Sequence, residues 1–322
     1  MKDNREIIPF DDGRQQPGVI CAANESRFAG SFLSEPLTAF AVGWKDPTDL
    51  LAILDFLAPS VPVGRRFEFK KAVNSEAFLS ETDDVRSIGA EFKRVDFTGE
   101  TVNEKTLNKG LTIRVDHDSE EGADWRERYT QLLLQRLYRN EVRRAIALLA
   151  AAATDLSKTW TYNDSSNKYP NPDKDVRDSL VLGTDASGIR PNRIAWGEGA
   201  WDLRADAFDS QNNPAGYRSA GLLPEEVARK LLVDAVRIIS ARYQSSASAK
   251  TKILGSYVYM FYALDGAAKD EPSNIKRFVT PTDAGNFRVY LEEKAKFTDI
   301  SVEHYSNIVI TSTLGIRRIT AS

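Results

Sequence analysis

The residues of this 322-residue chain that could most readily do nucleophilic or metal chemistry are two histidines, His117 and His304, and one cysteine, Cys21. A zinc site needs several Cys or His ligands, and Cys–His or Ser–His catalysis would have to use one of these two imidazoles. A single cysteine also excludes an internal disulfide and is typical of a reducing cytosol. The composition therefore predicts no catalytic residues, no cofactor-binding residues and no metal ligands, which means a protein that is not an enzyme.

One cluster could still hold a metal, namely Asp116, His117 and Asp118, together with Asp83 and Asp84. The triplet ends an alternating polar and apolar segment, which predicts a strand, and alternate residues of a strand point to the same face. The two aspartates would then point together and the histidine away, which is poor geometry for a metal. We interpret the triplet as the polar end of a strand that leads into Ser119 as a helix cap.

Two further segments have simple structural interpretations. Gly183–Gly188 lacks the lysine and the spacing of a phosphate-binding loop, so we interpret it as a turn. Tyr257, Tyr259, Phe261 and Tyr262 fall in one apolar strand, where a core or a subunit interface is favoured over a platform for stacking bases.

Charge and hydropathy exclude several classes of partner. The net charge is −3 and the pI is about 5.7, so no global basic field draws the chain to nucleic acid or to a membrane surface. No apolar run approaches the roughly 20 residues of a membrane span. The first residues, MKDNREIIPFDD, lack the apolar core of a secretory signal peptide. We expect no membrane partner.

The longest element predicted is a helix over 125–160, because this stretch contains neither Gly nor Pro and consists largely of good helix formers. A helix of this length spans roughly 50 Å, too long to be enclosed by one compact domain, which favours a strut that packs on a flat sheet or on other subunits. Its apolar stripe is expected at Leu134, Tyr138, Val142, Ala145, Leu149, Ala152 and Leu156, widened by Leu133, Leu137 and Ile146.

Several arginines of this helix lie largely off the apolar stripe. They form either a solvated face with local pairing, for example to Glu141, or contacts with acidic surfaces of adjacent subunits. The residues concerned are Arg128, Arg136, Arg139, Arg143 and Arg144.

The N-terminal third has two parts that we expect to be ordered mainly by neighbouring subunits. Residues 1–45 show no periodicity but contain too many apolar residues for a solvated tail, which indicates an extended arm across a neighbouring surface. A short helix follows, with Asp46 as its cap and Leu50–Leu57 as its apolar face. Segments near Arg66–Lys70 and Leu111–Asp116 alternate and bracket a polar stretch, which predicts a two-stranded projection resting on another chain.

The remaining elements predict a mixed α and β arrangement. Helices are expected at 175–182, 199–208 and 224–232, and polar loops at 163–175, 211–221 and 266–285. Strands are expected at 192–196, 236–243, 253–263, 287–297, 300–304 and 307–311, with a last short strand before Ser322.

This order of elements resembles the major capsid protein of tailed bacteriophages, the Hong Kong 97-type fold. The strands at Arg65–Ala72 and Lys109–Asp116 resemble the base of that family's extended loop, and Trp125–Trp160 its spine helix. The segment Gly188–Gly197, GIRPNRIAWG, resembles the entry to its axial domain. The C-terminal runs FRVY, SVEHY, IVI and LGIRRI resemble its closing strands.

The resemblance implies an α+β fold with the following domains. An N-terminal arm and short helix would occupy 1–63, the extended β-hairpin loop 64–118 and the spine helix of the peripheral domain 119–160. The axial domain would lie mainly in 161–286, and strands at 287–322 would return to the peripheral domain.

The function that the resemblance implies is that of a head shell subunit in the virion of a double-stranded DNA phage. It would assemble in the host cytoplasm, with itself as main partner, as hexamers and pentamers of an icosahedral shell. Scaffold, portal and decoration proteins are further expected partners, and the packaged DNA would lie close without specific recognition. Some family members crosslink subunits through a Lys–Asn bond; Lys105, Asn108 and Lys109 lie in the projection, but no acceptor Asn or activating Glu is identifiable, so this chemistry is not carried over.

Two other functions stay open at this point. An encapsulin-like bacterial nanocompartment shell would share the fold and enclose protein, and a soluble α/β enzyme would form only a small oligomer. Only about sixty residues precede the projection, which is too short for a built-in scaffold segment.

Overall fold

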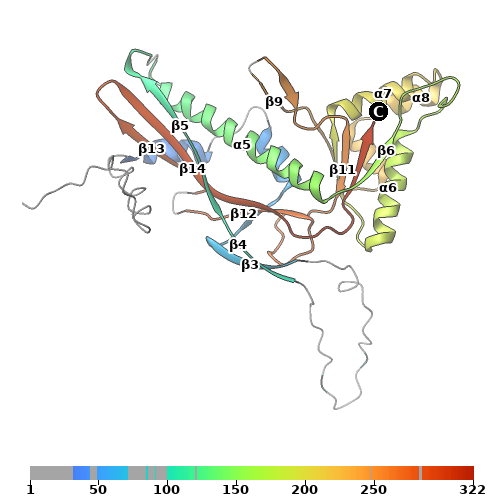
Figure 1. Cartoon of the computed structure of the whole chain (residues 1–322), viewed down its shortest axis with the longest axis horizontal. Helices are drawn as coiled ribbons and strands as arrows, with labels where there is room; N and C mark the ends of the chain where they lie inside the picture. The colour runs from blue at the N-terminus through green and yellow to red at the C-terminus, as the bar shows by residue number, and fades with distance from the viewer. Residues whose placement is uncertain are drawn as a thin grey trace, which may run out of the picture.

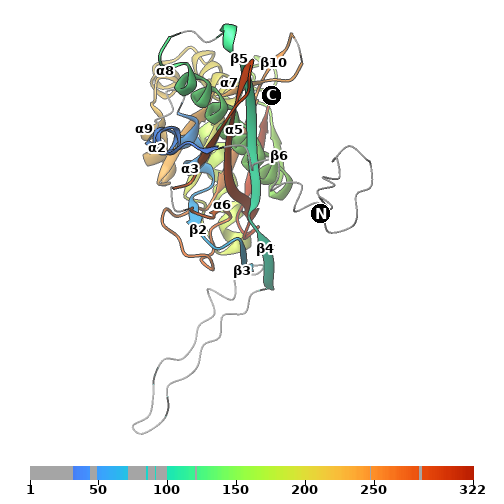
Figure 2. The same ribbon diagram turned by 90° about the vertical axis from the view of Figure 1, so that its left-hand side faces the viewer.

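The computed structural model describes residues 32–43, 49–71, 85, 91, 100–119, 122–246, 248–282 and 285–322. Two sheets and a long helix organise this part of the chain, which forms a thin slab when seen edge-on (Figures 1 and 2). The predicted α+β class is confirmed.

The larger sheet is centred on β14, Phe297–Ile310, whose length lets it pair with three neighbours. It runs antiparallel to β5, Leu107–Asp116, along most of its length, to β13, Arg288–Glu293, at one end and to β12, Ile275–Val279, at the other. The outer strands are β1, Phe32–Leu33, on β13 and β2, Ser60–Pro62, parallel to β12.

Helix α5, Trp125–Ala152, lies along this sheet, as its apolar stripe predicts (Figure 1). Leu134, Val142 and Leu149 are fully buried in a core that includes Ile300 and Val302 of β14. Helices α2, Glu35–Gly43, and α3, Leu50–Leu57, pack against α5 in the same core. The helix thus serves as the strut expected from its length, with its own sheet as the support.

The second sheet has its own helical layer. Its strand order is β6 (Thr154–Lys158), β15 (Arg317–Ala321), β11 (Tyr257–Phe261), β7 (Arg193–Gly197) and β8 (Ala235–Ile239). A separate core, with Trp160, Trp196 and Leu180 fully buried, joins it to its helices. These are α6 (Pro172–Ser187), α7 (Glu198–Asp209) and α9 (Pro224–Leu231), with α8 (Pro214–Ala220) against α7.

Two small ribbons complete the described structure. β3, Arg66–Lys71, pairs with β4, Glu100–Lys105, and lies beyond the end of the larger sheet (Figure 1). β9, Arg242–Gln244, pairs with β10, Lys250–Lys252.

The predicted helix over 125–160 is too long at its C-terminal end. The chain becomes extended at Ala153, and Thr154–Lys158 forms β6, parallel to β15. Pairing Leu156 with Ile319 completes the second sheet, which outweighs local helix propensity. Leu156 is accordingly 37% exposed and does not belong to the buried stripe.

The predicted pairing of the projection is also wrong. The partner of β3 is β4, whereas β5 belongs to the larger sheet. The reason is burial: Val115 enters the main core with Leu111 and Ile113 against it, which pairing with β3 would not provide. Thr106 separates β4 from β5.

Other differences concern shorter elements. Residues 32–43 pack on the chain's own core, with Leu37 and Ala41 buried. Residues 1–31 and Asp46, the predicted cap, lie outside the described residues. β12 lies within the expected loop 266–285 and α8 within the expected loop 211–221. The strand expected at 236–243 is divided into β8 and β9, those expected between 297 and 311 form one continuous β14, and β15 joins the second sheet.

Candidate functional site

Of the cluster first considered for metal chemistry, the structure describes Asp116, His117 and Asp118, and these three do not come together as a metal site. β5 ends at Asp116, and His117–Ser119 forms a 3-10 turn, so the strand geometry assumed for the triplet does not apply. His117 Nε2 lies 3.2 Å from the hydroxyl of Thr298, and the Asp118 amide donates to Asp116 Oδ1 at 3.0 Å. Among the described residues no group of three or more acidic, His or Cys side chains could hold a metal ion, and Asp83 and Asp84 lie outside them.

Ser119 does not cap the long helix, because α5 begins only at Trp125, after Asp124. Gly183–Gly188 is the last turn of α6, with Gly188 at φ 68° as its left-handed C-cap. Tyr259 and Phe261 are buried and Tyr257 is 38% exposed, which confirms that this strand contributes to the core.

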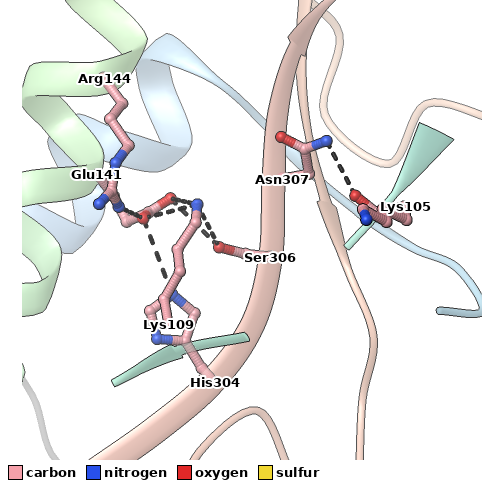
Figure 3. Close-up of polar contacts among 7 residues, drawn as sticks. All are labelled: Lys105, Lys109, Glu141, Arg144, His304, Ser306 and Asn307. Carbon is pink, nitrogen blue, oxygen red and sulfur yellow. Dashed lines mark hydrogen bonds and ion pairs between the residues drawn. The ribbon is translucent and has the colours of Figure 1, made fainter. Parts of the chain in front are cut away.

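The second histidine, His304, belongs to the main cluster of buried charges, which we call the Glu141 node: Lys109, Glu141, Arg144, His304 and Ser306 (Figure 3). Three elements supply it, because α5 carries Glu141 and Arg144, β5 carries Lys109, and β14 carries His304 and Ser306. The sequence predicts Glu141 only as a partner of its helical neighbours, and Arg144 is indeed one of them.

The geometry of the node centres on the Glu141 carboxylate, of which 3% is exposed. Lys109 Nζ donates to both carboxylate oxygens, at 2.9 and 3.1 Å, and lies 3.2 Å from the Ser306 hydroxyl. That hydroxyl donates to Glu141 at 3.3 Å, and His304 Nε2 lies 3.9 Å from the carboxylate. A buried carboxylate with this many partners is held in one position.

The electrostatics follow from burial and neighbouring charge. Burial acts to raise the pKa of Glu141, but Lys109 and the other positive groups outweigh it and hold this pKa below its ordinary value. Burial lowers the pKa of Lys109, and Glu141 offsets part of that change. Burial also lowers the pKa of His304 to about 4, so the imidazole is neutral at neutral pH. The contact between Lys109 and Glu141 favours the charged form of each side chain.

The node ties the long helix to the two longest strands of the larger sheet. Lys109 lies only four residues after Lys105, where β4 ends, so the same contacts fix the root of the β3–β4 ribbon relative to α5. Such an arrangement positions the three elements relative to one another. No sequence signal identified it, because its three elements are distant in the chain: Lys109 is 32 residues from Glu141 and 197 residues from Ser306.

Aromatic packing fixes the same ribbon from its other side. Phe67 and Phe69 lie with ring centroids 4.4 and 5.5 Å from that of Phe278 in β12. The hydroxyls of Thr106 and Thr280 are 2.8 Å apart. The ribbon therefore leaves the sheet in a defined direction.

Lys105, Asn108 and Lys109, which were considered for a Lys–Asn crosslink, lie near the root of the β3–β4 ribbon. Asn307 donates from its side-chain amide to the Lys105 carbonyl at 3.0 Å (Figure 3), and Asn108 donates to Glu303 at 3.0 Å. Lys109 is engaged in the Glu141 node. These contacts bind the ribbon to β14 within one chain.

The second sheet contains a buried ion group of its own. Arg204, fully buried, donates to both oxygens of Asp173 at 2.6 and 3.1 Å, and Lys230 reaches the same carboxylate at 2.8 Å. This group connects α6, α7 and α9 and holds the helical layer together. Within the described part of the chain, no helix is both long and apolar enough to span a bilayer.

Comparison with known proteins relates this architecture to solved structures only. No protein-family model matches the sequence, and neither does any curated protein. A phage-related protein from Bordetella bronchiseptica superimposes with a TM-score of 0.65 at 20% identity, over 90% of this chain and 97% of that chain. A structure from Microbacterium phage Oxtober96 gives a TM-score of 0.51 at 10% identity, over 85% and 90%.

A third structure, the asymmetric unit of the bacteriophage PhiM1 mature capsid, gives a TM-score of 0.48 at 11% identity, over 84% of this chain and 86% of that chain. The similarity to the first two structures extends over 90% and 85% of this chain, respectively. The chain therefore has the Hong Kong 97-type fold of tailed-phage major capsid proteins.

Proposed function

We propose that this protein is the major capsid protein of a tailed double-stranded DNA phage and assembles as hexamers and pentamers into an icosahedral head shell. The observation that carries the proposal is the fold itself, shared over 90% of the chain with a phage-related protein. The shape supports it, because a thin slab with a projecting ribbon suits a unit of a closed wall (Figure 2).

The domain division proposed with it assigns α5 and the larger sheet to a peripheral domain and 161–286 mainly to an axial domain. The two cores support this division, since α5 and the larger sheet contribute to one of them and helices α6, α7 and α9 contribute to the other. Scaffold, portal and decoration proteins belong to the proposal as expected partners, and the virion, assembled in the host cytoplasm, as its location.

We also propose that the subunit has no catalytic activity of its own. The support is the role of its polar clusters: the Glu141 node and the Asp173 group both hold elements together, and each is closed by partners from the same chain. Function would instead come from many subunit contacts that are individually weak and jointly stable.

Electron microscopy and sedimentation of the full-length protein test the proposal. We expect closed particles of megadalton mass, with the hexameric and pentameric units visible in averaged images. A small, defined oligomer without shells would contradict the shell function and favour the enzyme alternative.

The contents of particles from the native source separate phage head from nanocompartment. Nuclease-protected double-stranded DNA is expected for a head, whereas an enclosed protein and no DNA would show an encapsulin-like compartment.

A further inference from the structure

One face of α5 carries arginines with no exposed carboxylate beside them. Arg136, Arg139 and Arg143 follow at spacings of three and four, so they line up along one side of the helix over about 10 Å. Between 129 and 152 the only carboxylate of the helix is Glu141, which points to the opposite, buried side. Among the described residues, none of the three arginines forms an ion pair.

The β9–β10 ribbon extends this positive surface. The guanidinium of Arg143 stacks on the ring of Tyr243 at 3.9 Å from its centroid, which joins helix and ribbon. The segment 242–252 contains no acidic residue. Glu198, on α7, partly balances it by pairing with Arg242 at 2.7 Å and Lys252 at 3.7 Å. We call the following residues the basic face: Arg136, Arg139, Arg143, Arg242, Lys250 and Lys252.

The other side chains of the ribbon indicate which partner suits this face. Gln244, Ser245, Ser246 and Thr251 are polar, and the ribbon has none of the large exposed hydrophobic side chains of the described residues. Protein interfaces usually have a core rich in aromatic and apolar groups. Contacts to phosphate instead use Arg and Lys together with Ser, Thr and Gln side chains.

We propose that the basic face binds the phosphate backbone of double-stranded nucleic acid, without reading its sequence. The proposal deepens the proposed shell function, on which it rests for the identity of the enclosed partner. Duplex DNA presents one negative charge per about 1.7 Å of axis, so a row of arginines about 10 Å long meets several phosphates at once. An overall charge of −3 fits this arrangement, because attraction is confined to one surface.

The test measures binding of the full-length, unassembled protein to a fluorescent duplex of random sequence, about 30 base pairs long, between about 50 and 200 mM salt. The variant replaces Arg136, Arg139 and Arg143 together with Gln. We expect its dissociation constant to rise by roughly tenfold or more at the lower salt. We also expect the plot of log K against log salt to become shallower by about two to three units, since each lost phosphate contact removes about 0.9.

The matched control replaces three other exposed arginines, Arg177, Arg218 and Arg229, with Gln. It removes the same number of positive charges, but from residues that do not belong to the basic face. The affinity for the duplex and the salt slope should therefore stay near those of the unchanged protein. Thermal unfolding of both variants shows whether each is folded. Equal weakening by both variants, or an unchanged protein that does not bind the duplex, would overturn the proposal.

Shell formation by the same variants separates this proposal from the shell function. Closed particles from the Arg136→Gln, Arg139→Gln and Arg143→Gln variant, together with weakened DNA binding, support the basic face as the nucleic-acid contact. Normal DNA binding with loss of particles would show an interface between copies and overturn it. Particles that fail to form even from the unchanged protein would contradict the shell function alone, because binding is measured on unassembled protein.

Discussion

Replacing Glu141 with Gln should be among the most destabilising polar substitutions in this protein, because it leaves Lys109 charged and nearly enclosed. Only 11% of the Lys109 side chain is exposed, and its carboxylate partner supplies two of its three polar contacts. Removing one partner of a buried ion pair costs about 3–5 kcal/mol. Since the Ser306 hydroxyl and an amide oxygen remain near Lys109, we expect a loss near the lower end, about 3 kcal/mol.

Arg144 should add little to that loss. Its side chain is 49% exposed, so water replaces the lost carboxylate, and an exposed pair contributes at most about 1 kcal/mol. The same reasoning makes Glu127→Gln, at an exposed position of α5, a suitable control with no measurable change expected.

Urea unfolding of the unassembled subunit, followed by tryptophan fluorescence, measures these differences. The subunit must be unassembled, because association with other copies raises apparent stability. A double variant, Lys109→Met with Glu141→Leu, removes both charges and should recover most of the loss, since apolar pairs of similar volume often replace buried ion pairs without cost. Lys109→Met and Glu141→Leu are also measured singly. If the loss of the double variant equals the sum of these two losses, or if Glu141→Gln costs less than about 1 kcal/mol, this account of the node is refuted.

Three further predictions concern stability. Because burial lowers the pKa of His304 from 6.5 to about 4, the folded subunit should lose about 3 kcal/mol as pH falls through this window; His304→Gln should flatten this dependence in urea unfolding, and an unchanged dependence would contradict the burial of the imidazole. Leu149→Ala, at a fully buried position, should cost about 2–5 kcal/mol in the same assay, and an unchanged midpoint would contradict its place in the core. Phe278→Ala should cost about 3–5 kcal/mol and also increase protease cleavage near the β3–β4 ribbon; cleavage at the original rate would show that other contacts direct the ribbon.

The sequence was informative where local pattern and tertiary contact agree. The apolar stripe of α5 and the alternation in β3 and β5 each appear at or near the predicted positions. Helix α9 was predicted within one residue of its end, since Pro224 suits its first turn and Glu226 bonds back to the Leu223 amide.

The sequence misled where distant contacts decide the structure. β12, IKRFV, contains two charged residues and stands between polar segments, so it was interpreted as loop. Lys276 is nevertheless buried, because its Nζ donates to the carbonyls of Ala268, Lys269 and Glu271 at 2.6 to 3.0 Å. Arg277 pairs with Asp55, 222 residues away, at 2.7 Å. No local pattern shows that such partners exist.

Because contacts between distant residues leave no local pattern, the fold as a whole indicated a function more clearly than any single site did. In β11, Val258 and Met260 point into one core while Tyr259 and Phe261 point into the other. The second sheet is therefore buried on both faces and connects the two cores as one rigid unit. Since the polar clusters described above are used to fix elements within this unit, new contacts must be made at its surfaces, which include the ribbon root and the basic face. A plate with directed projections suits the closed assembly proposed above, because contacts related by rotational symmetry use the same surfaces of every copy again and again.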